Sequence, residues 1–355
     1  MKLLLKFLQE EAFIASYKND MMMEIQLKQR VLVVSFSVLI VTHGREELLM
    51  KCLDSLFPGI ESWQLIILAN GKELPPEILE KAQSLTPYFT HLKTEAQVSP
   101  GSARNLALES VEGEWIYFLD DDAFVREGYW EKVLPLLQDP RIDVLGGPDS
   151  PAQGMNALSL SLALALSSPF CTGATFSRHK STGSKLQYAD EEKLTSCNLW
   201  VRKAALGNVT FPEDYIRAEE TLFLQRLKKE GRGFFYHPRL VVGHFRRSKF
   251  KELWRPSFYA GFFRSKLMKE KLKKGNEAFW LPSVFVLLHF LIFIEPFSFW
   301  YLARMYVSVI LFVSMGLAMR VRRFWLFPLI AFLHYFIVFM YGIGFLTERI
   351  RRIKG

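Results

Sequence analysis

The stretch Trp115-Ile116-Tyr117-Phe118-Leu119-Asp120-Asp121-Asp122 decides the fold class of this chain. Its first five residues form an apolar, aromatic-rich run typical of a buried strand, and three carboxylates follow without a break. Adjacent carboxylates raise one another's pKa, so three in a row are costly unless a cation lies nearby. Mg²⁺ and Mn²⁺ bind such oxygen ligands, and in open α/β sheets binding sites form at the ends of strands. The stretch therefore predicts a divalent-metal site, with a polar turn and an Asp N-cap for the next helix as the alternative.

Patterns typical of strands and helices alternate on both sides of this stretch. Apolar, β-branched runs end in turn signals such as Ala69-Asn70-Gly71, and residues with helical spacing follow them. Strands are expected at 31–41, 64–68, 89–92, 115–119 and 142–145, and helices at 45–56, 75–85, 101–110, 127–137 and 156–166. This alternation predicts an α/β fold with a mainly parallel sheet covered by helices on both faces.

The composition changes along the 355 residues of the chain. Half of the residues are hydrophobic and 31 are Phe, and the longest apolar runs come after Ala278. The expected parts are an N-terminal extension, amphipathic or weakly ordered, at 1–30, an α/β domain at 31–263, a basic juxtamembrane segment at 264–277, membrane helices at 278–347 and a basic tail at 348–355.

The last part of the chain predicts membrane helices. Residues 324–346 carry no formal charge and, as a helix, would cover the about 30 Å of a bilayer core. The stretch 279–319 is long enough for two helices, broken near Pro296 or within 301–304. A soluble protein with very apolar buried helices is the alternative.

The basic residues conflict with a simple count of crossings. A formal net charge of +9 suits an anionic membrane or nucleic acid, and the adjacent apolar runs favour the membrane, so no nucleic-acid partner is expected. Basic clusters before 278, at 320–323 and at 349–354 all favour the cytoplasmic side, which three full crossings cannot achieve. The number of crossings stays open: one apolar unit is re-entrant or interfacial, or the tail is external.

The three cysteines indicate a reducing compartment. Cys52, Cys171 and Cys197 are widely spaced and form no metal-binding pattern. We interpret them as reduced thiols of a cytosolic domain attached to the inner membrane.

Several motifs, in a fixed order, resemble those of family-2 glycosyltransferases of the GT-A fold from about Ser37 to Gly261. The segments that carry the resemblance are the first strand and its turn at 37–45, the end of the second strand at 65–71, a helix start at 101–105, Asp120-Asp121-Asp122 as the DxD motif, the segment 197–202 and the acidic helix 217–227. The resemblance implies a GT-A catalytic domain at 31–263 that binds a nucleotide-sugar donor and a divalent metal, Mn²⁺ or Mg²⁺.

The resemblance also implies which residues hold the donor and the metal. The implied donor contacts are Thr42, Arg45, Asn70, Arg104, Asn105, Asp120 and Asp121, and the implied metal ligands are Asp122, Asp120 and His244. A metal at this place would neutralise the departing diphosphate, and the N-terminus of the helix at 101–105 favours phosphate. The alternatives are a helix-surface salt bridge for Arg104 and a structural role for His244.

One position departs from the pattern of the family. Ala69 stands where the family usually has an aspartate that accepts a hydrogen bond from the base of the nucleotide. Because alanine cannot accept this bond, uridine as the base of the donor is in doubt.

An acidic pair stands at the position of the family's catalytic aspartate. The resemblance implies that Glu220 is the base that deprotonates the acceptor hydroxyl, with Glu219 as its competitor because a glutamate is longer than an aspartate. Direct attack with such a base implies inversion at the anomeric carbon. The alternative for the pair is a solvated helix N-terminus, where acidic residues are favoured.

A third group of residues is expected on the acceptor side. These residues are Asn198, Trp200 and Arg255. Core packing is the alternative for Trp200. Arg246 and Arg247 are expected to hold a phosphorylated acceptor or to face lipid head groups. A mobile loop at 173–185 is expected near the substrate, with a plain surface loop as the alternative.

The expected function is that of a membrane-attached, metal-dependent, inverting glycosyltransferase. Its acceptor would be a lipid-linked sugar or a growing polysaccharide at the cytoplasmic face of the inner membrane. The alternatives are transfer to polyprenyl phosphate, which makes a single lipid-linked sugar, and a non-catalytic membrane scaffold with a decayed transferase domain.

Overall fold

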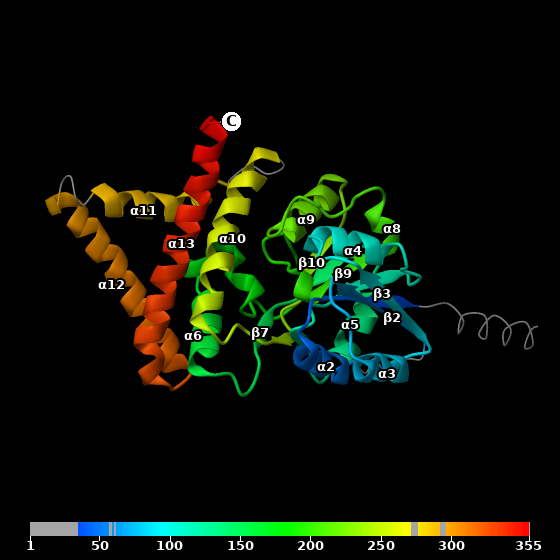
Figure 1. Ribbon diagram of the computed structural model, residues 1–355. Coiled ribbons are helices and arrows are strands. Elements are labelled where there is room, and N and C mark those ends of the chain that lie inside the picture. The colour runs from blue at the N-terminus through cyan, green and yellow to red at the C-terminus, as the bar shows by residue number, and fades with distance from the viewer. Residues whose placement is uncertain (1–34, 57–58, 60–61, 271–275, 292–295, 355) are drawn as a thin grey trace, which may run out of the picture.

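The computed structural model describes residues 35–56, 59, 62–270, 276–291 and 296–354, which form an α/β domain with a layer of long helices beside it (Figure 1). The predicted extension at 1–30 lies outside the described residues, as does the start of the first predicted strand. All five strands and all five helices that the alternation predicts are present, with ends shifted by a few residues.

The main sheet has eight strands in the order β3-β2-β1-β4-β9-β6-β10-β8. Their bounds are β1 Phe36–Thr42, β2 Trp63–Asn70, β3 Tyr88–Thr94, β4 Trp115–Phe118, β6 Val144–Gly146, β8 Gln187–Tyr188, β9 Leu199–Arg202 and β10 Phe234–Tyr236. The first four in this order are parallel, which confirms the mainly parallel sheet. The antiparallel strand β9 lies between β4 and β6 and was not predicted.

Helices cover both faces of the main sheet, as predicted. On one face lie α2 (Glu46–Asp54), α3 (Pro76–Leu85) and α5 (Trp130–Leu136), and on the other α4 (Pro100–Leu108) and α9 (Glu219–Lys229) (Figure 1). The short helix α8 (Lys203–Leu206) follows β9. Strands β1 and β2 are buried on both sides, which explains why their sequences read as continuous apolar runs.

A second, small sheet joins three distant parts of the chain. Its strands are β5 (Ala123–Val125), β11 (Val242–His244) and β7 (Asp149–Pro151), in that order. The register pairs His244 with Ala123, the residue after the aspartate run, and with Pro151. This sheet, which was not predicted, thereby brings His244 beside Asp122 and Asp149.

The remaining helices form a layer at the side of the α/β domain (Figure 1). They are α6 (Ala157–Leu166), α7 (Pro169–Thr172), α10 (Trp254–Leu267), α11 (Leu281–Leu291), α12 (Pro296–Arg320) and α13 (Phe327–Lys354). Short 3-10 turns lie at Gly173–Arg178, Ser196–Asn198, Phe250–Glu252, Met268–Glu270, Asn276–Trp280 and Phe324–Leu326. Helix α13 lies at the centre of the layer and packs against α6, α10, α11 and α12.

The predicted membrane helices correspond to α11, α12 and α13. Among the described residues, one helical unit, Phe324–Ile353, is by length and composition able to cross a bilayer, a property that a buried core helix can share. The pair Ala157–Leu166 and Pro169–Arg178, bent by 77°, reaches the same length and apolarity only when its two parts are taken together. The predicted basic tail is not a separate segment, because α13 continues through it to Lys354.

Glycines allow α10 and α13 to approach closely. A Cβ atom added to Gly261 of α10 would lie 1.9 Å from the carbonyl oxygen of Tyr341, and one added to Gly344 of α13 would lie 1.9 Å from that of Phe258. Side chains at either position would push the two helices apart. The close packing of α13 against α10 therefore depends on the absence of side chains at these two residues.

Gly261→Ala is expected to lower the free energy of unfolding by about 1–3 kcal/mol, because the added methyl group meets backbone. The matched control is Gly316→Ala on α12, where an added Cβ has no heavy atom within 4 Å. Alanine there is expected to be neutral or to stabilise by up to about 1 kcal/mol through helix propensity. Denaturant unfolding of the detergent-solubilised protein, followed by circular dichroism, measures both. Equal effects of the two substitutions would contradict close packing at Gly261.

Candidate active site

The aspartate run lies at the carboxyl ends of β1 and β4, where the backbone gives its three side chains different environments. Asp121 is fully buried, and the hydroxyl of Thr42 donates to its Oδ2 atom at 2.7 Å. The guanidinium group of Arg45 donates to the same oxygen at 3.1 Å and forms ion pairs with both Asp121 and Asp122. Burial raises the pKa of Asp121 to about 6, although Arg45 opposes this shift. The side chains of Asp120 and Asp122 are 32% and 15% exposed, so these two carboxylates are the accessible ones.

His244 connects Asp122 to a second buried carboxylate, that of Asp149. The distance from His244 Nε2 to Asp122 Oδ1 is 3.0 Å, and that from His244 Nδ1 to Asp149 Oδ2 is 3.3 Å. Burial and the nearby Arg246 disfavour the charged imidazole, but the two carboxylates outweigh them and raise the pKa of His244 well above its usual value. Burial likewise disfavours the ionised form of Asp122, yet His244 and Arg45 hold the pKa of that carboxyl below its usual range.

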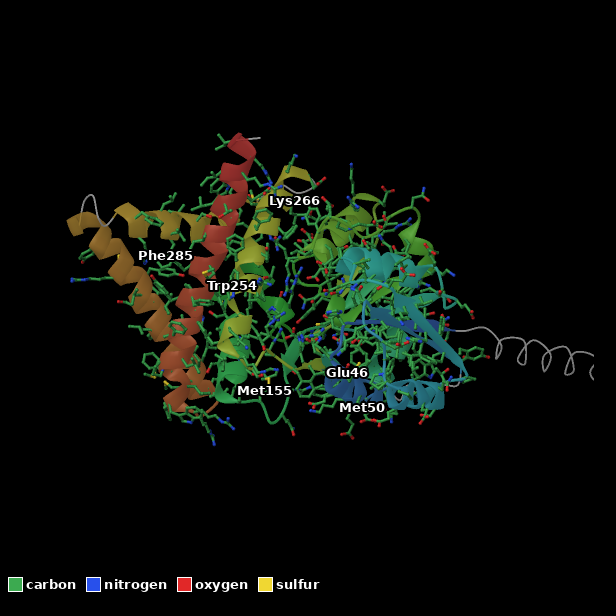
Figure 2. All side chains as sticks on the ribbon, in the orientation of Figure 1. Glu46, Met50, Met155, Trp254, Lys266 and Phe285 are labelled. Atoms are coloured by element: carbon green, nitrogen blue, oxygen red, sulfur yellow. The ribbon has the colours of Figure 1, made fainter. Side chains whose placement is uncertain are left out.

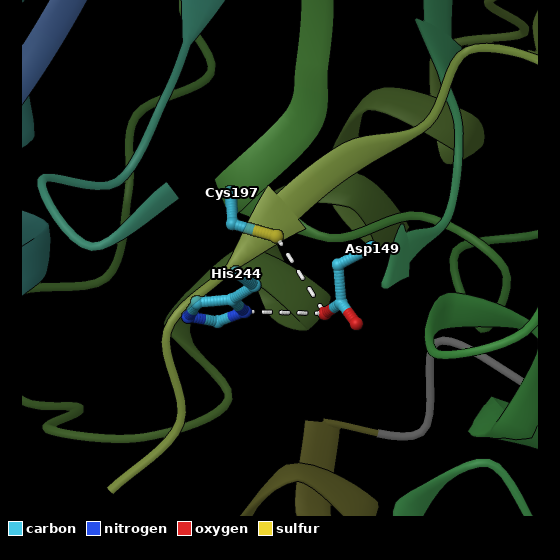
Figure 3. Close-up of side chains that lie close together, drawn as sticks. All are labelled: Asp149, Cys197 and His244. Carbon is cyan, nitrogen blue, oxygen red and sulfur yellow. Dashed lines mark hydrogen bonds and ion pairs between the residues drawn. The ribbon is translucent and has the colours of Figure 1, made fainter. Parts of the chain in front are cut away.

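Asp149, Cys197 and His244 bring their ligand atoms within 4.8 Å of one another (Figure 3). This trio is a poor site for a hard cation. Burial raises the pKa of Cys197 to about 11, so the residue is a neutral thiol, and its Sγ atom lies 3.9 Å from Asp149 Oδ2. Asp149 is already paired with Arg246 and with His179, the latter at 3.0 Å. The trio instead supports His244 from behind, as carboxylates commonly do for metal-binding histidines.

The predicted metal ligands Asp120, Asp122 and His244 offer donor types better suited to Mn²⁺ or Mg²⁺, two carboxylates and one imidazole, and all three side chains are partly exposed. Among the described residues, however, the trio with Asp149 and Cys197 is the group whose three ligand atoms lie within 4.8 Å of one another. Both candidate sites share His244, so they describe one region of the molecule.

Arg104 of α4 joins the aspartate run to the acidic pair of α9. Its Nη1 atom donates to Glu219 Oε1 at 2.8 Å, while its Nη2 atom lies 3.4 Å from Asp120 Oδ1 and 3.2 Å from the hydroxyl of Ser196. The residue is 8% exposed. Arg104 is therefore a buried bridge within the site, and the alternative of a helix-surface salt bridge is wrong.

The two glutamates at the start of α9 differ in exposure and in partner. The side chain of Glu219 is 8% exposed and paired with Arg104, and burial raises its pKa. The side chain of Glu220 is 19% exposed, and it accepts hydrogen bonds from Arg178 at 2.8 Å and from Ser196 at 3.1 Å. Burial alone would raise the pKa of Glu220, but Arg178 and Arg104 outweigh it and lower that pKa. Of the pair, Glu220 is the more accessible and the more readily ionised.

The turn before α9 adopts an uncommon backbone conformation. Ala218 precedes Glu219 with a φ of 62°, in the left-handed region that residues other than glycine seldom occupy. Such strain persists only where the surrounding structure imposes it, often at functional sites. Here it orients the first turn of α9, and with it both glutamates, toward Arg104 and Arg178.

Two residues that were predicted to contact the nucleotide-sugar donor, Asn70 and Asn105, instead bind backbone groups of neighbouring loops. The side chain of Asn70 bonds to both the backbone N–H and the carbonyl of Val98, and so fixes the loop before α4. Asn105 bonds in the same way to the backbone of Phe211. Ala69 is fully buried and its methyl group packs in the core under α2 and α3, so position 69 itself offers no polar side chain to a nucleotide base.

Two predictions for the acceptor side are wrong. Asn198 is fully buried and bonds to the hydroxyl groups of Tyr117 and Tyr129. Trp200 is also fully buried, stacks on Tyr117 at 4.3 Å and donates to the hydroxyl of Tyr129 at 2.9 Å. Both residues belong to the core, the alternative given for Trp200. Arg255 lies near the start of α10, where its guanidinium group is 5.3 Å from the ring of Trp254.

Sequence reasoning missed two residues that hold the site together. Arg178 lies in the loop predicted near the substrate, where its guanidinium group donates to the carbonyls of Glu191 and Glu192 as well as to Glu220. Asp149 follows Gly146-Gly147-Pro148, a strand end of the kind that carries site residues. The strand end was visible in the sequence, but nothing in it indicated that Asp149 would meet His244.

Comparisons with known proteins agree with this geometry. The family model described as "Glycosyl transferase family 2" matches residues 37–198. The minor teichoic acid biosynthesis protein GgaB of Bacillus subtilis is 28% identical over 211 residues, which cover 55% of this chain and 22% of GgaB. The poly(ribitol-phosphate) beta-N-acetylglucosaminyltransferase TarS of Staphylococcus aureus is 27% identical over 117 residues, which cover 32% of this chain and 20% of TarS. The chain thus spans about a fifth of the length of these curated relatives.

Among solved structures, the mannosyltransferase PcManGT from Pyrobaculum calidifontis, in complex with GDP-Man and Mn²⁺, has a similar fold. The TM-score is 0.53 at 13% identity, and the match covers 90% of this chain and 96% of that one. The sheet, the carboxylates at its edge and these matches together define a GT-A domain. Residues 37–198, somewhat less than half of the chain, match the model of glycosyltransferase family 2, so this part of the chain is similar to enzymes of that family.

Asp149→Asn is expected to weaken Mn²⁺ binding by about 10–100-fold, because the support of a metal-binding histidine is lost while the side-chain shape is kept. The control is Asp54→Asn, at a side chain that is 57% exposed and paired with Lys81. Titration of Mn²⁺ followed by electron paramagnetic resonance measures both affinities without any substrate. Wild-type affinity in Asp149→Asn would exclude His244 as a ligand held by Asp149.

Proposed function

We propose that this protein is an inverting, metal-dependent glycosyltransferase that moves a sugar from a nucleotide-sugar donor to a lipid-linked or polysaccharide acceptor. The observation that carries the proposal is the buried bridge of Arg104, which joins the aspartate run to the acidic pair. A site of this kind offers a place for an anionic leaving group and, next to it, a base. TarS, by its name, transfers N-acetylglucosamine to poly(ribitol phosphate), and PcManGT binds GDP-Man with Mn²⁺, which supports a nucleotide-sugar donor and a polymer acceptor here.

On the donor side, Asp120, Asp122 and His244 would hold Mn²⁺ or Mg²⁺. A divalent ion at this place supplies a Lewis acid that neutralises the charge of the departing diphosphate. Arg45 lies beside the same carboxylates and is 45% exposed, so its guanidinium group can turn to a phosphate oxygen.

On the acceptor side, Glu220 is the proposed base. Its lowered pKa keeps it ionised at neutral pH, and Arg178 and Ser196 orient its two oxygens. Glu219 has a supporting role in this proposal, because Arg104 holds it and it is the more buried of the two. Attack by the hydroxyl that Glu220 deprotonates, opposite the leaving group, would invert the anomeric carbon.

A cluster of arginines near the two acidic groups supports a phosphate-bearing acceptor. The guanidinium groups of Arg217 and Arg247 form no hydrogen bond or ion pair with the described residues, unlike those of Arg45 and Arg246. Partial burial and the charges of Arg217, Arg45 and Arg246 lower the pKa of Arg247 to about 10. Guanidinium groups that repel one another favour a multivalent anion. Both a phosphate-containing polymer and polyprenyl phosphate meet this requirement.

The location proposed for the reaction is the cytoplasmic face of the inner membrane. The exposed apolar side chains of α11 and α12, the basic balance of the chain and its reduced cysteines support it. A lipid-linked acceptor would be available at this surface.

The proposal is tested with purified protein, Mn²⁺ and a panel of nucleotide sugars, with release of nucleoside diphosphate as the readout. Membrane lipid extract, polyprenyl phosphate and phosphate-containing polymer serve as alternative acceptors. Glu220→Gln is expected to lower kcat by about 10²–10⁴-fold with donor binding retained, because only the base is lost. Asp122→Asn is expected to lower kcat and also to weaken metal binding. The control is Glu77→Gln, at an exposed position of α3, which is expected to leave kcat and metal binding unchanged.

If no nucleotide sugar is consumed with any acceptor, the proposed activity is wrong. If Glu219→Gln stops turnover and Glu220→Gln does not, the base is Glu219. Product mass separates a single sugar on polyprenyl phosphate from an extended lipid-linked or polymeric product.

Arg178→Gln is expected to move the acidic limb of the pH–rate profile to higher pH. Without the guanidinium charge, the carboxylate of Glu220 loses its main stabilising partner, so its pKa rises and the base is protonated at a higher pH. The control is Arg141→Gln, because the Arg141 side chain is 67% exposed and pairs with Asp139 rather than with a carboxylate of the site. A profile that only falls in height, with no shift of the acidic limb, would assign Arg178 to acceptor binding instead.

A further inference from the structure

The outer side of the helical layer exposes a continuous set of apolar side chains. On α11 the exposed residues follow one stripe, at Leu281, Val284, Leu287 and Phe290. On α12 they are Tyr301, Met305, Val307, Val309, Leu311, Phe312, Met315 and Met319, and Phe312 is 82% exposed. Figure 1 shows α11 and α12 on the side of α13 that faces away from the α/β domain. We name these exposed side chains the outer apolar face.

Helix α12 contacts the rest of the protein through a narrow seam. Ile310, Ser314 and Ala318, spaced four residues apart, are its buried residues among those described. Most of the other described residues of the helix are apolar and exposed, with Arg304, Ser308 and Arg320 as the exposed polar exceptions. A helix with apolar side chains on most of its sides belongs in a protein core or in lipid, and most of α12 is not in a core.

Helix α13 cannot cross a bilayer with the α/β domain on one side, because α10 runs beside it. The ring of Phe250, just before α10, packs on Phe332 and Phe336, and Arg352 donates to the carbonyl of Ser265 at 2.6 Å. From Phe332 to Arg352, α13 rises by about 30 Å, the thickness of a bilayer core. The α10 region therefore covers one side of α13 along the whole segment that would have to span the bilayer core.

Helix α10 is in turn fixed to the α/β domain. Lys266, near the C-terminal end of α10 (Figure 2), forms an ion pair with Asp214. The rings of Tyr215 and Phe263 pack 5.4 Å apart. With 14 residues, α10 is too short to cross a bilayer. If α13 stood perpendicular to the membrane plane, polar surface of the α/β domain would therefore lie within the hydrocarbon region of the bilayer. Burying polar groups there is strongly unfavourable.

We propose that the protein docks on the membrane from one side, with the outer apolar face of α11 and α12 embedded in one leaflet and α13 lying roughly parallel to the membrane plane. The partner is the surface of an anionic phospholipid bilayer. This inference deepens the membrane location proposed above and rests on it. Arg320, Arg322, Arg323 and Arg351 lie toward the two ends of the helical layer, are exposed and form no ion pair with the described residues, which complements anionic head groups.

This arrangement removes the conflict between the basic clusters and the number of crossings. With no crossing, the clusters before 278, at 320–323 and at 349–354 all stay on the cytoplasmic side. The active site stays on that side as well, next to the acceptors of the membrane surface.

The first experiment is flotation of the full chain with phosphatidylcholine vesicles, with and without phosphatidylglycerol. The double variant Leu287→Glu/Phe312→Glu is expected to lose binding by about tenfold or more, because two charges would enter the apolar region. The matched control is Leu106→Glu on α4 of the α/β domain, a residue that is 43% exposed, and it is expected to float like the wild type. Phosphatidylglycerol is expected to strengthen binding, and added salt to weaken that gain. Unchanged flotation of the double variant would overturn the proposal, as would a soluble dimer that the double variant dissociates and that does not bind vesicles.

The second experiment separates docking from crossing. Arg322→Cys and Arg351→Cys place thiols near the opposite ends of α13, and wild-type protein gives the background from the native cysteines. A membrane-impermeant maleimide is expected to label both positions in sealed inverted vesicles and neither in right-side-out vesicles. Labelling from opposite sides would mean that α13 crosses and would overturn the proposal.

The failure of the docking proposal is distinguishable from that of the proposed function. Turnover of nucleotide sugar in detergent by the Leu287→Glu/Phe312→Glu protein depends on the active site alone. A variant that turns over normally but no longer floats confirms docking through the outer apolar face. If the wild type floats normally but neither it nor any variant turns over a nucleotide sugar, the proposed function is wrong and the docking proposal stands.

Discussion

The buried guanidinium group of Arg104 is the contact on which the site depends. It lies between carboxylates from two distant parts of the chain, Asp120 after β4 and Glu219 at the start of α9. Removing one partner of a buried ion pair costs about 3–5 kcal/mol, because the remaining charge is left without compensation. Helix α4 holds the group in place, since Ser99 caps its N-terminus and Ala103 packs in the core beneath it.

The same logic of paired charges extends over the rest of the site. Asp121 has Arg45, Asp149 has Arg246 and Glu220 has Arg178. A buried charge with a fixed partner stays ionised at neutral pH without the free-energy cost of an isolated one. Because the groups are oriented before any ligand arrives, binding of an anionic donor requires an exchange of partners and little reorganisation, which is the condition for effective electrostatic stabilisation.

The sequence predicted the first half of the fold well, for a physical reason. Strands buried on both faces have continuous apolar sequences with turns at their ends, and β1, β2 and β4 are of this kind. The three-residue strands β5, β7 and β11 are too short to show any period, so the small sheet was missed. That sheet is what places His244 next to Asp122.

The residues of the candidate site were likewise predicted where their pattern is local in the sequence and missed where it is not. Residues that belong to one motif, such as Asp120 to Asp122 or Glu219 and Glu220, were found because their chemistry is local. Arg178 and Asp149 were missed because their partners are distant in the sequence, and no local pattern reports such a pairing. Asn198 and Trp200 were placed on the acceptor side, but motif order carries no information on whether a side chain points into the core. Asn198, in the turn before β9, and Trp200, on β9, are both fully buried.

Apolar composition alone could not decide how the C-terminal helices meet the membrane. Helix α13 is the longest apolar helix among the described residues, yet α6, α10, α11 and α12 pack around it. Helix α12 has a similar composition but contacts its neighbours through a single seam. What distinguishes a helix that faces lipid from a helix that forms a core is the set of elements packed against it, and here that set includes α10, which the α/β domain holds. The longest apolar helix is therefore the centre of the helical layer, and the proposed lipid-facing surface is carried by α11 and α12.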